Sequence, residues 1–289
     1  MKLLWILVVG LAATACGKSA APSKDRAPPV PTTADAAPRP AADDIPADGL
    51  TFPPVAPAVG DKVVVTSSRT RSVMAADRPG IQVTTAVVRE EDTEVMAVDG
   101  DRVTRLKVGY RTCSSTEVVG NTSTELPIPT AGQTYLVWRE GDALQATRAD
   151  GAPVSPEELA TLGKHQARVG RPDGLQAVVA ARRWKRDEPV PLAATDLARV
   201  APAVVGEDPD ARLVAMGLTL QSADAKRAVF AVTATIERAG TAGSATQALT
   251  GLVKVQRVGG RVLEVHLGGP IADGGGASGT MDAITRFTY

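Results

Sequence analysis

The chain has 289 residues and carries 32 basic against 32 acidic side chains, so its formal net charge is zero. A balanced charge provides no overall field that would attract nucleic acid or acidic substrates, and we expect no nucleic-acid partner. Because the sequence has only two histidines, a histidine-based metal site would need help from carboxylates. We predict no metal and no cofactor.

The first sixteen residues follow the plan of a secretory signal. Lys2 supplies a positive start, residues 3–11 form an apolar run, and residues 12–15 are small and end before Cys16. The apolar run is shorter than the roughly 20 residues that a membrane-spanning helix needs. We therefore predict a signal peptide over residues 1–15.

The cysteine that directly follows the small residues resembles the lipobox of bacterial lipoproteins, with Ala13 where that family more often has Leu. The resemblance implies that the Cys16 thiol is acylated and that Cys16 becomes the new N-terminus. Because one acyl chain attaches a protein only reversibly, the three chains typical of such lipoproteins imply a durable membrane anchor. The alternative is a conventional signal, cleaved or not, with an incidental cysteine.

The residue after the lipobox bears on which membrane holds the anchor. Gly17 stands where an Asp commonly retains such lipoproteins at the inner membrane, and in a Gram-negative cell this favours the outer membrane, facing the periplasm. In other bacteria the resemblance implies the outer face of the cell membrane. With Cys16 acylated, Cys113 is alone, which excludes a disulfide framework and effectively excludes a thiolate zinc site within one chain.

A tether is predicted over residues 16–58. Residues 17–58 contain 10 Pro and 11 Ala in 42 positions, and such a composition buries too little apolar surface to offset the entropy of ordering. We predict a disordered, partly polyproline-like segment that spaces the domain from the membrane. Alternatively the Pro-rich run is a ligand for a partner, although it lacks repeated PxxP spacing.

From residue 59 to residue 289 the sequence predicts one antiparallel β domain. Its first part alternates polar and apolar residues, as half-buried strands do. Asp99-Gly100 is a hairpin signal, and residues 102–108 alternate after it. Residues 135–138 and 144–147 are predicted to form another strand pair.

The middle of the chain departs from this pattern. Ser155, Pro156 and Glu158 have the spacing of a capping box with Pro at the first helical position, which predicts a helix beginning here. A second short helix is predicted from Thr195 or Asp196 to just before Pro202. Residues 175–181 are apolar and are compatible with either a strand or a helix.

The last third returns to strands. Residues 212–220 and 228–236 are predicted to pair, as are residues 252–258 and 261–267 across Gly259-Gly260. Residues 280–289 would complete the sheet as a final strand. The pattern therefore consists of two similar halves, 59–150 and 205–289, around a helical insert, and a duplication stays open as an explanation.

These elements predict a mainly β (α+β) fold. We expect a large curved antiparallel sheet or a half-open β-barrel, with one or two short helices packed on it. The helical insert would cover a concave apolar face. Such an architecture is similar to that of carriers and lipid-binding lipoproteins of the bacterial envelope, at the level of the fold alone.

One basic cluster departs from the background of the sequence. Arg182, Arg183, Trp184, Lys185 and Arg186 place four positive charges around an aromatic residue. We predict contact with an anionic surface, such as lipid headgroups, with the indole at the interface. The alternative is a solvated run of charge that the two acidic residues after it neutralise.

The remaining candidates for chemistry favour structural interpretations. Cys113 lies in a predicted strand without a nucleophile signature and is interpreted as a small, partly buried apolar residue. His266 falls on the polar side of its strand, which predicts a surface histidine. His165 follows the capped helix and is interpreted as opposing the negative end of the helix dipole.

Two further motifs have residue types that also occur in ion sites. The acidic residues in 90–94 lack the spacing of a calcium loop and are interpreted as solvated charge at a strand end. The glycines at 274–276 precede no helix and are interpreted as a flexible loop rather than an anion cradle.

The sequence as a whole favours a membrane-anchored, exported lipoprotein that is not an enzyme and has no catalytic residues. It would bind a lipid or other hydrophobic ligand between its sheet and its helices. The alternative is a structural or interaction protein of the cell envelope that binds another protein through its sheet face. A hydrolase ranks third, since no Ser/His/Asp spacing is visible.

Overall fold

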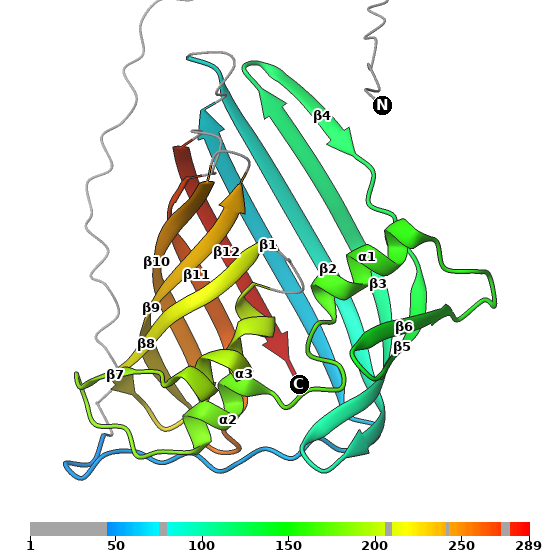
Figure 1. Cartoon of the computed structure of the whole chain (residues 1–289). Helices are drawn as coiled ribbons and strands as arrows, with labels where there is room; N and C mark the ends of the chain where they lie inside the picture. Colours follow the sequence, from blue (N-terminus) through cyan, green and yellow to red (C-terminus); the bar gives the residue numbers. More distant parts are fainter. Residues whose placement is uncertain (1–44, 75–79, 206–209, 241–242, 273–277) are drawn as a thin grey trace, which may run out of the picture. The chain divides into compact units, whose positions relative to one another are not determined.

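Twelve strands form one open antiparallel sheet in the part of the chain that the structure describes (Figure 1). The structure is a computed structural model, and it describes residues 45–74, 80–205, 210–240, 243–272 and 278–289. The strand order is β6-β5-β3-β2-β1-β12-β11-β10-β9-β8-β7, with β4 paired to β3 beside this path. Because the two end strands do not pair with each other, the sheet is not closed into a barrel.

The strands form two series, one before and one after the helical insert. The first series is β1 (Lys62–Met74), β2 (Gln82–Asp99), β3 (Arg102–Val119), β4 (Thr122–Leu126), β5 (Thr134–Glu140) and β6 (Ala143–Arg148). The second is β7 (Pro189–Pro191), β8 (Ala211–Ala223), β9 (Arg227–Gly240), β10 (Gly243–Gln256), β11 (Val262–Ala272) and β12 (Ser278–Thr288). The mainly β fold class is thereby confirmed.

The predicted hairpins are present. Strands β2 and β3 pair around Asp99-Gly100, β5 pairs with β6, β8 with β9, and β10 with β11. The predicted final strand is β12, which pairs with β1 as well as with β11, so that Val65 lies opposite Phe287. This pairing joins the first series of strands to the second.

Three helices interrupt the strands in the described part of the chain. Helix α1 (Pro156–His165) begins with the predicted capping box, in which the Ser155 side chain accepts from the Glu158 amide at 3.1 Å and Glu158 accepts from the Ser155 amide at 2.7 Å. The segment left open between strand and helix is α2 (Gly174–Ala180). Helix α3 (Ala194–Val204) runs past Pro202, which therefore lies inside the helix rather than beyond its end.

Helices α2 and α3 pack closely because of one glycine. A Cβ atom at Gly174 would lie 2.1 Å from the carbonyl oxygen of Arg199, so only glycine allows this approach of the two backbones. Leu175, Val178 and Val179 then share one buried side of α2, at the i, i+3 and i+4 positions that face the same way. The insert is thereby held as a unit against the sheet.

The described residues form two apolar clusters on one face of the sheet. We call this the inner face and define it by Val65, Leu106 and Leu218. The larger cluster packs α2 and α3 against β8, β9 and β10. The smaller cluster packs Leu162 of α1 against β2, β3 and β5. As predicted, the helices cover an apolar face of the sheet, because the alternation of each strand places every second side chain on that face.

The segment before β1 corrects the predicted tether. Leu50 and Phe52 are 5% and 3% exposed and belong to the larger apolar cluster. The backbone of Leu50 also pairs with that of Trp184, with N–H···O distances of 2.8 and 2.7 Å. The prediction of a disordered tether is therefore wrong for residues 45–58, where Leu50 and Phe52, with Ile45 beside the same cluster, dock the chain. Residues 16–44, including Cys16, lie outside the described residues.

Candidate binding site

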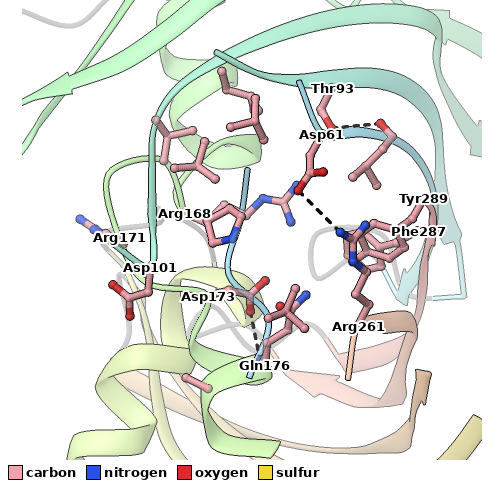
Figure 2. Close-up of a pocket in the computed structure, with 18 of the residues that line it drawn as sticks. Asp61, Thr93, Asp101, Arg168, Arg171, Asp173, Gln176, Arg261, Phe287 and Tyr289 are labelled. Atoms are coloured by element: carbon pink, nitrogen blue, oxygen red, sulfur yellow. Dashed lines mark hydrogen bonds and ion pairs between the residues drawn. The ribbon is translucent and has the colours of Figure 1, made fainter. Parts of the chain in front are cut away.

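A cavity of about 200 Å³ lies on the inner face, between the sheet and the loop that joins α1 to α2 (Figure 2). Its lining comes from separate segments of the chain: residues 54–63, strands β2 and β3, residues 168–180, Arg261, and the end of β12 with Tyr289. No helix of the described residues is long and apolar enough to cross a membrane.

The floor of the cavity crosses neighbouring strands of the sheet. Val95 on β2 lies beside Leu106 on β3, and Val63 on β1 lies beside Thr93 on β2. Val95 and Leu106 are 7% and 4% exposed. The hydroxyl of Thr93 donates to the Val63 carbonyl at 3.0 Å, so its proton is already used within the protein. This part of the cavity is therefore apolar.

The opposite wall is the loop between α1 and α2, and Arg139 of β5 fixes its path. The Arg139 guanidinium donates to the carbonyl of Val169 at 2.6 Å and to that of Ala167 at 3.1 Å. Gly170, at φ +77°, lies against the Arg139 side chain, and its amide donates to the Val103 carbonyl at 2.8 Å. These contacts hold the backbone on both sides of Arg168.

A buried polar cluster anchors the start of the same loop. The Gln166 amide nitrogen donates to Glu91 at 3.2 Å and to the Tyr110 hydroxyl at 3.4 Å, and Arg89 lies 3.4 Å from Glu91. Gln166, Glu91 and Tyr110 are each no more than 2% exposed. Burial, with the nearby Glu91 charge, raises the pKa of Tyr110, so its hydroxyl stays protonated. The cluster joins the end of α1 to the inner face.

Several charged groups at the cavity already have partners. Arg261 lies 3.6 Å from Asp61 and stacks over the Tyr289 ring at 4.6 Å (Figure 2). Asp173 caps α2 by accepting from the Gln176 amide at 3.2 Å. Burial, followed by the charge of Asp173, raises the pKa of Tyr289 to about 12, so this phenol is neutral near pH 7.

Arg168 differs from these charged groups because an aromatic ring, and not a carboxylate, is its partner. Its guanidinium stacks over the Phe287 ring at 5.7 Å and is directed into the cavity, toward Asp61 and Arg261 (Figure 2). Among the described residues no carboxylate lies within 4.0 Å of its nitrogens. Arg171, three residues later, points away from this group in the same view. The cavity thus combines an apolar floor with one partly buried cation that has no carboxylate partner.

The structure places Trp184 of the predicted anionic-surface contact in the core instead. The indole is 0% exposed, packs edge-on against Phe230 at 4.9 Å, and donates to the Val179 carbonyl at 2.9 Å. An interfacial role for Trp184 is therefore wrong. The charges beside Trp184 do not decide its burial, because neighbouring side chains of an extended segment point to opposite sides: the indole turns inward while Arg183 and Lys185 turn outward.

The cations around Trp184 separate into two groups. Arg182 pairs with Asp196 at 2.6 Å, and Arg183 pairs with Asp48 of the docked segment. Lys185 and Arg186 are exposed, and Arg186 lies 3.5 Å from Asp187. Contact of this surface with anionic lipid stays a prediction for the exposed cations Arg183, Lys185 and Arg186.

The other candidate residues from the sequence are Cys113, His266 and His165, and each has different surroundings. Cys113 packs beside the smaller apolar cluster, and burial raises the pKa of its thiol, which keeps the thiol protonated and a poor nucleophile. His266 lies on the outer face, as predicted, 2.6 Å from Asp282. The prediction that His165 opposes the helix dipole is wrong. Its ring lies beside Tyr110, and burial lowers the pKa of the imidazole to about 3, so it carries no charge near pH 7.

The acidic residues at 90–94 are also not simply solvated. Glu91 turns into the buried polar cluster, whereas Glu90 and Asp92 on the other face both contact Arg111. They lie in the middle of β2 rather than at a strand end. The glycines at 274–276 lie outside the described residues.

Most of the cavity residues were not recognisable from the sequence. Arg168 and Arg171 were visible only as basic residues upstream of the cluster at 182–186, and Arg261 only as part of a strand. No local pattern connects residue 54 with residue 289, because the cavity is created by the pairing of β1 with β12 and by the return of the chain over the sheet. The alternation of the strands was the available signal, and it predicted the apolar inner face but not the cations on it.

Comparison with known proteins adds little to this geometry. No protein family profile matches the chain, and no curated protein matches it in sequence. A structure described as showing lipid–protein interactions in lipovitellin matches 80% of this chain at 8% identity with a TM-score of 0.27, and this chain spans about a quarter (25%) of that chain. An outer membrane channel from Pseudomonas putida F1 matches 81% of this chain and 97% of its own at 9% identity with a TM-score of 0.20. At such TM-scores neither likeness assigns a function.

Proposed function

We propose that the β domain is a binding module that holds a small hydrophobic ligand, or one apolar chain of a larger lipid, in the cavity on its inner face. The observation that carries the proposal is an apolar-floored cavity of about 200 Å³ between the sheet and the helical insert. Binding rather than catalysis is proposed, since the groups nearest the cavity serve as caps, ion pairs and stacked cations.

The volume of the cavity limits what it can hold. An engineered apolar cavity of about 150 Å³ stays dry and binds benzene, whereas sites for drug-sized ligands are about 300–1,000 Å³. A cavity of about 200 Å³ therefore suits one ring or one short aliphatic segment. A lipid with two acyl chains would leave most of its apolar surface outside.

Filling the cavity is expected to abolish binding. Ala177 lines the cavity from α2, and Ala177→Phe places a ring in the volume that the ligand would occupy. We expect N-phenyl-1-naphthylamine, an uncharged fluorescent apolar probe, to bind the native protein with its phenyl ring in the cavity and with a blue-shifted emission. It should bind Ala177→Phe at least about tenfold more weakly.

The matched control is Ala181→Phe, which adds the same ring at the exposed end of α2 and should bind the probe as the native protein does. Native mass spectrometry and lipid extraction of the purified protein complete the test. Equal probe binding by native protein and Ala177→Phe, or a ligand-free mass that does not shift when short-chain lipids are added, would overturn the proposal. The alternative of an envelope interaction protein acting through its sheet face would then lead.

We further propose that the chain is exported and anchored through acylated Cys16, which the signal plan of residues 1–16 supports. Cys16→Ser removes the thiol to which acyl chains attach. We expect the native protein in the membrane fraction of bacteria that express it, and Cys16→Ser in the soluble fraction or retained as the uncleaved precursor. Cys113→Ser, which changes the sequence's other cysteine, should fractionate as the native protein does. A membrane-bound Cys16→Ser of mature mass would count against the anchor.

A further inference from the structure

The charges around the cavity favour one class of hydrophobic ligand over others. Arg261 with Asp61, and Asp173 with the start of α2, are engaged within the protein. Asp101, at the exposed side of the cavity, lies 3.9 Å from Arg102. Arg168 has the Phe287 ring as its partner and, within the described residues, no carboxylate. The cation most available to a ligand is therefore Arg168.

The position of Arg168 is set by the protein rather than by the side chain itself. The carbonyls on either side of it, Ala167 and Val169, are both held by Arg139, and Val169 is 1% exposed. The face of Phe287 then supports the guanidinium from the sheet. A guanidinium held in this way has already lost part of its conformational freedom, so an incoming anion meets a preorganised donor.

The apolar floor lies across the sheet from this cation. Phe287 is on β12, opposite Val65 of β1, whereas Val95 and Leu106 are on β2 and β3. The cavity therefore has an apolar part over β2 and β3 and a cationic part over β12. A ligand that satisfies both parts has an apolar body and one anionic end.

We propose that the natural ligand of the cavity is a single-chain anionic amphiphile of the fatty-acid class, with its carboxylate paired to Arg168 and its chain over Val95 and Leu106. This inference rests on the proposed function. A planar carboxylate can accept two parallel N–H bonds from a guanidinium, a geometry that an alcohol cannot reproduce. Asp61 and Asp173 repel a second negative charge, which disfavours dianionic ligands.

The test compares two ligands of equal chain length and different charge. Decanoate and decanol displace N-phenyl-1-naphthylamine from the purified protein, each below its aggregation concentration and at low ionic strength. We expect decanoate to bind about tenfold or more tightly than decanol, since a hydrogen bond between two charged groups is stronger than one to a neutral hydroxyl. In Arg168→Gln that preference should disappear while decanol binding is unchanged.

Arg111→Gln is the matched control, because Arg111 lies on the other face of the sheet, where it contacts Glu90 and Asp92. It should keep the preference for decanoate, and Arg168→Lys should keep part of it. Equal binding of decanoate and decanol by the native protein would overturn the inference and leave the proposed function standing. A preference that survives in Arg168→Gln would overturn the role of Arg168. Binding of neither ligand would overturn both the inference and the proposed function.

Discussion

Replacing Trp184 by alanine is expected to lower the free energy of unfolding by about 3–5 kcal/mol. The indole is 0% exposed and lies between the helical insert and the sheet, against Phe230 at 4.9 Å. Its loss leaves a cavity that closely packed neighbours cannot fill, and it leaves the Val179 carbonyl without the donor that lies 2.9 Å away. Because Leu50 and Phe52 belong to the same apolar cluster as Trp184, the docked segment before β1 should loosen as well.

Urea denaturation followed by circular dichroism measures this loss, and Trp138→Ala serves as the matched control. Trp138 of β5 is only half-buried, with its ring nitrogen 3.2 Å from Glu140 at the surface. Trp138→Ala should lower the free energy of unfolding clearly less than Trp184→Ala does. If Trp184→Ala unfolded at the same urea concentration as the native protein, its placement in the core would be wrong, and an exposed indole beside the four cations would again be the better interpretation.

Acidification from pH 6.5 to pH 5 is expected to destabilise the protein through His165. Burial lowers the pKa of His165 to about 3, and the charges of Arg89 and Lys164 act in the same direction. In the unfolded chain the imidazole takes up a proton below its ordinary pKa of 6.5, whereas in the folded protein it stays neutral until about pH 3. The unfolded state thus binds more protons across this window, so stability falls as pH falls.

The free energy of unfolding should fall by about 1.4 kcal/mol for each pH unit once the imidazole of the unfolded chain is fully protonated. His165→Phe removes the titrating group and keeps a ring against Tyr110, so the slope between pH 6.5 and pH 5 should largely disappear. His266→Phe changes the sequence's other histidine, on the outer face, and should keep the slope. The same slope in His165→Phe as in the native protein would show that the imidazole does not lie in the buried cluster.

The pH range ends at pH 5 so that the titration of the Glu158 carboxyl does not contribute to the slope. The hydroxyl of Tyr135 donates to Glu158 at 2.5 Å, and this bond, with the Ser155 amide, lowers the pKa of the Glu158 carboxyl. A carboxyl with a lowered pKa stabilises the protein above its unfolded pKa of 4.5, and that contribution is lost as the pH falls further. Measurements above pH 5 therefore report on His165.

Local patterns of residues were enough to predict several strands, two hairpins and the start of one helix. Alternation predicted the strands, Asp99-Gly100 and Gly259-Gly260 predicted hairpins, and Ser155 with Glu158 predicted the start of α1. Each of these signals depends on residues a few positions apart, whose turn geometry or capping bonds form within the segment itself. Where local preferences were balanced, as at residues 175–181, the sequence left the element open.

Which side chains are buried, and which of them meet, depends on long-range packing. Trp184 and His165 stand among charged neighbours in the sequence, yet both turn inward, because the burial of one side chain depends on what packs over it and not on the polarity of the residues beside it. Arg168 reaches Phe287 across 119 positions of the chain only because β12 pairs with β1 and the loop after α1 returns over the sheet. The cavity and its cation are products of that long-range pairing, which no short stretch of the sequence encodes.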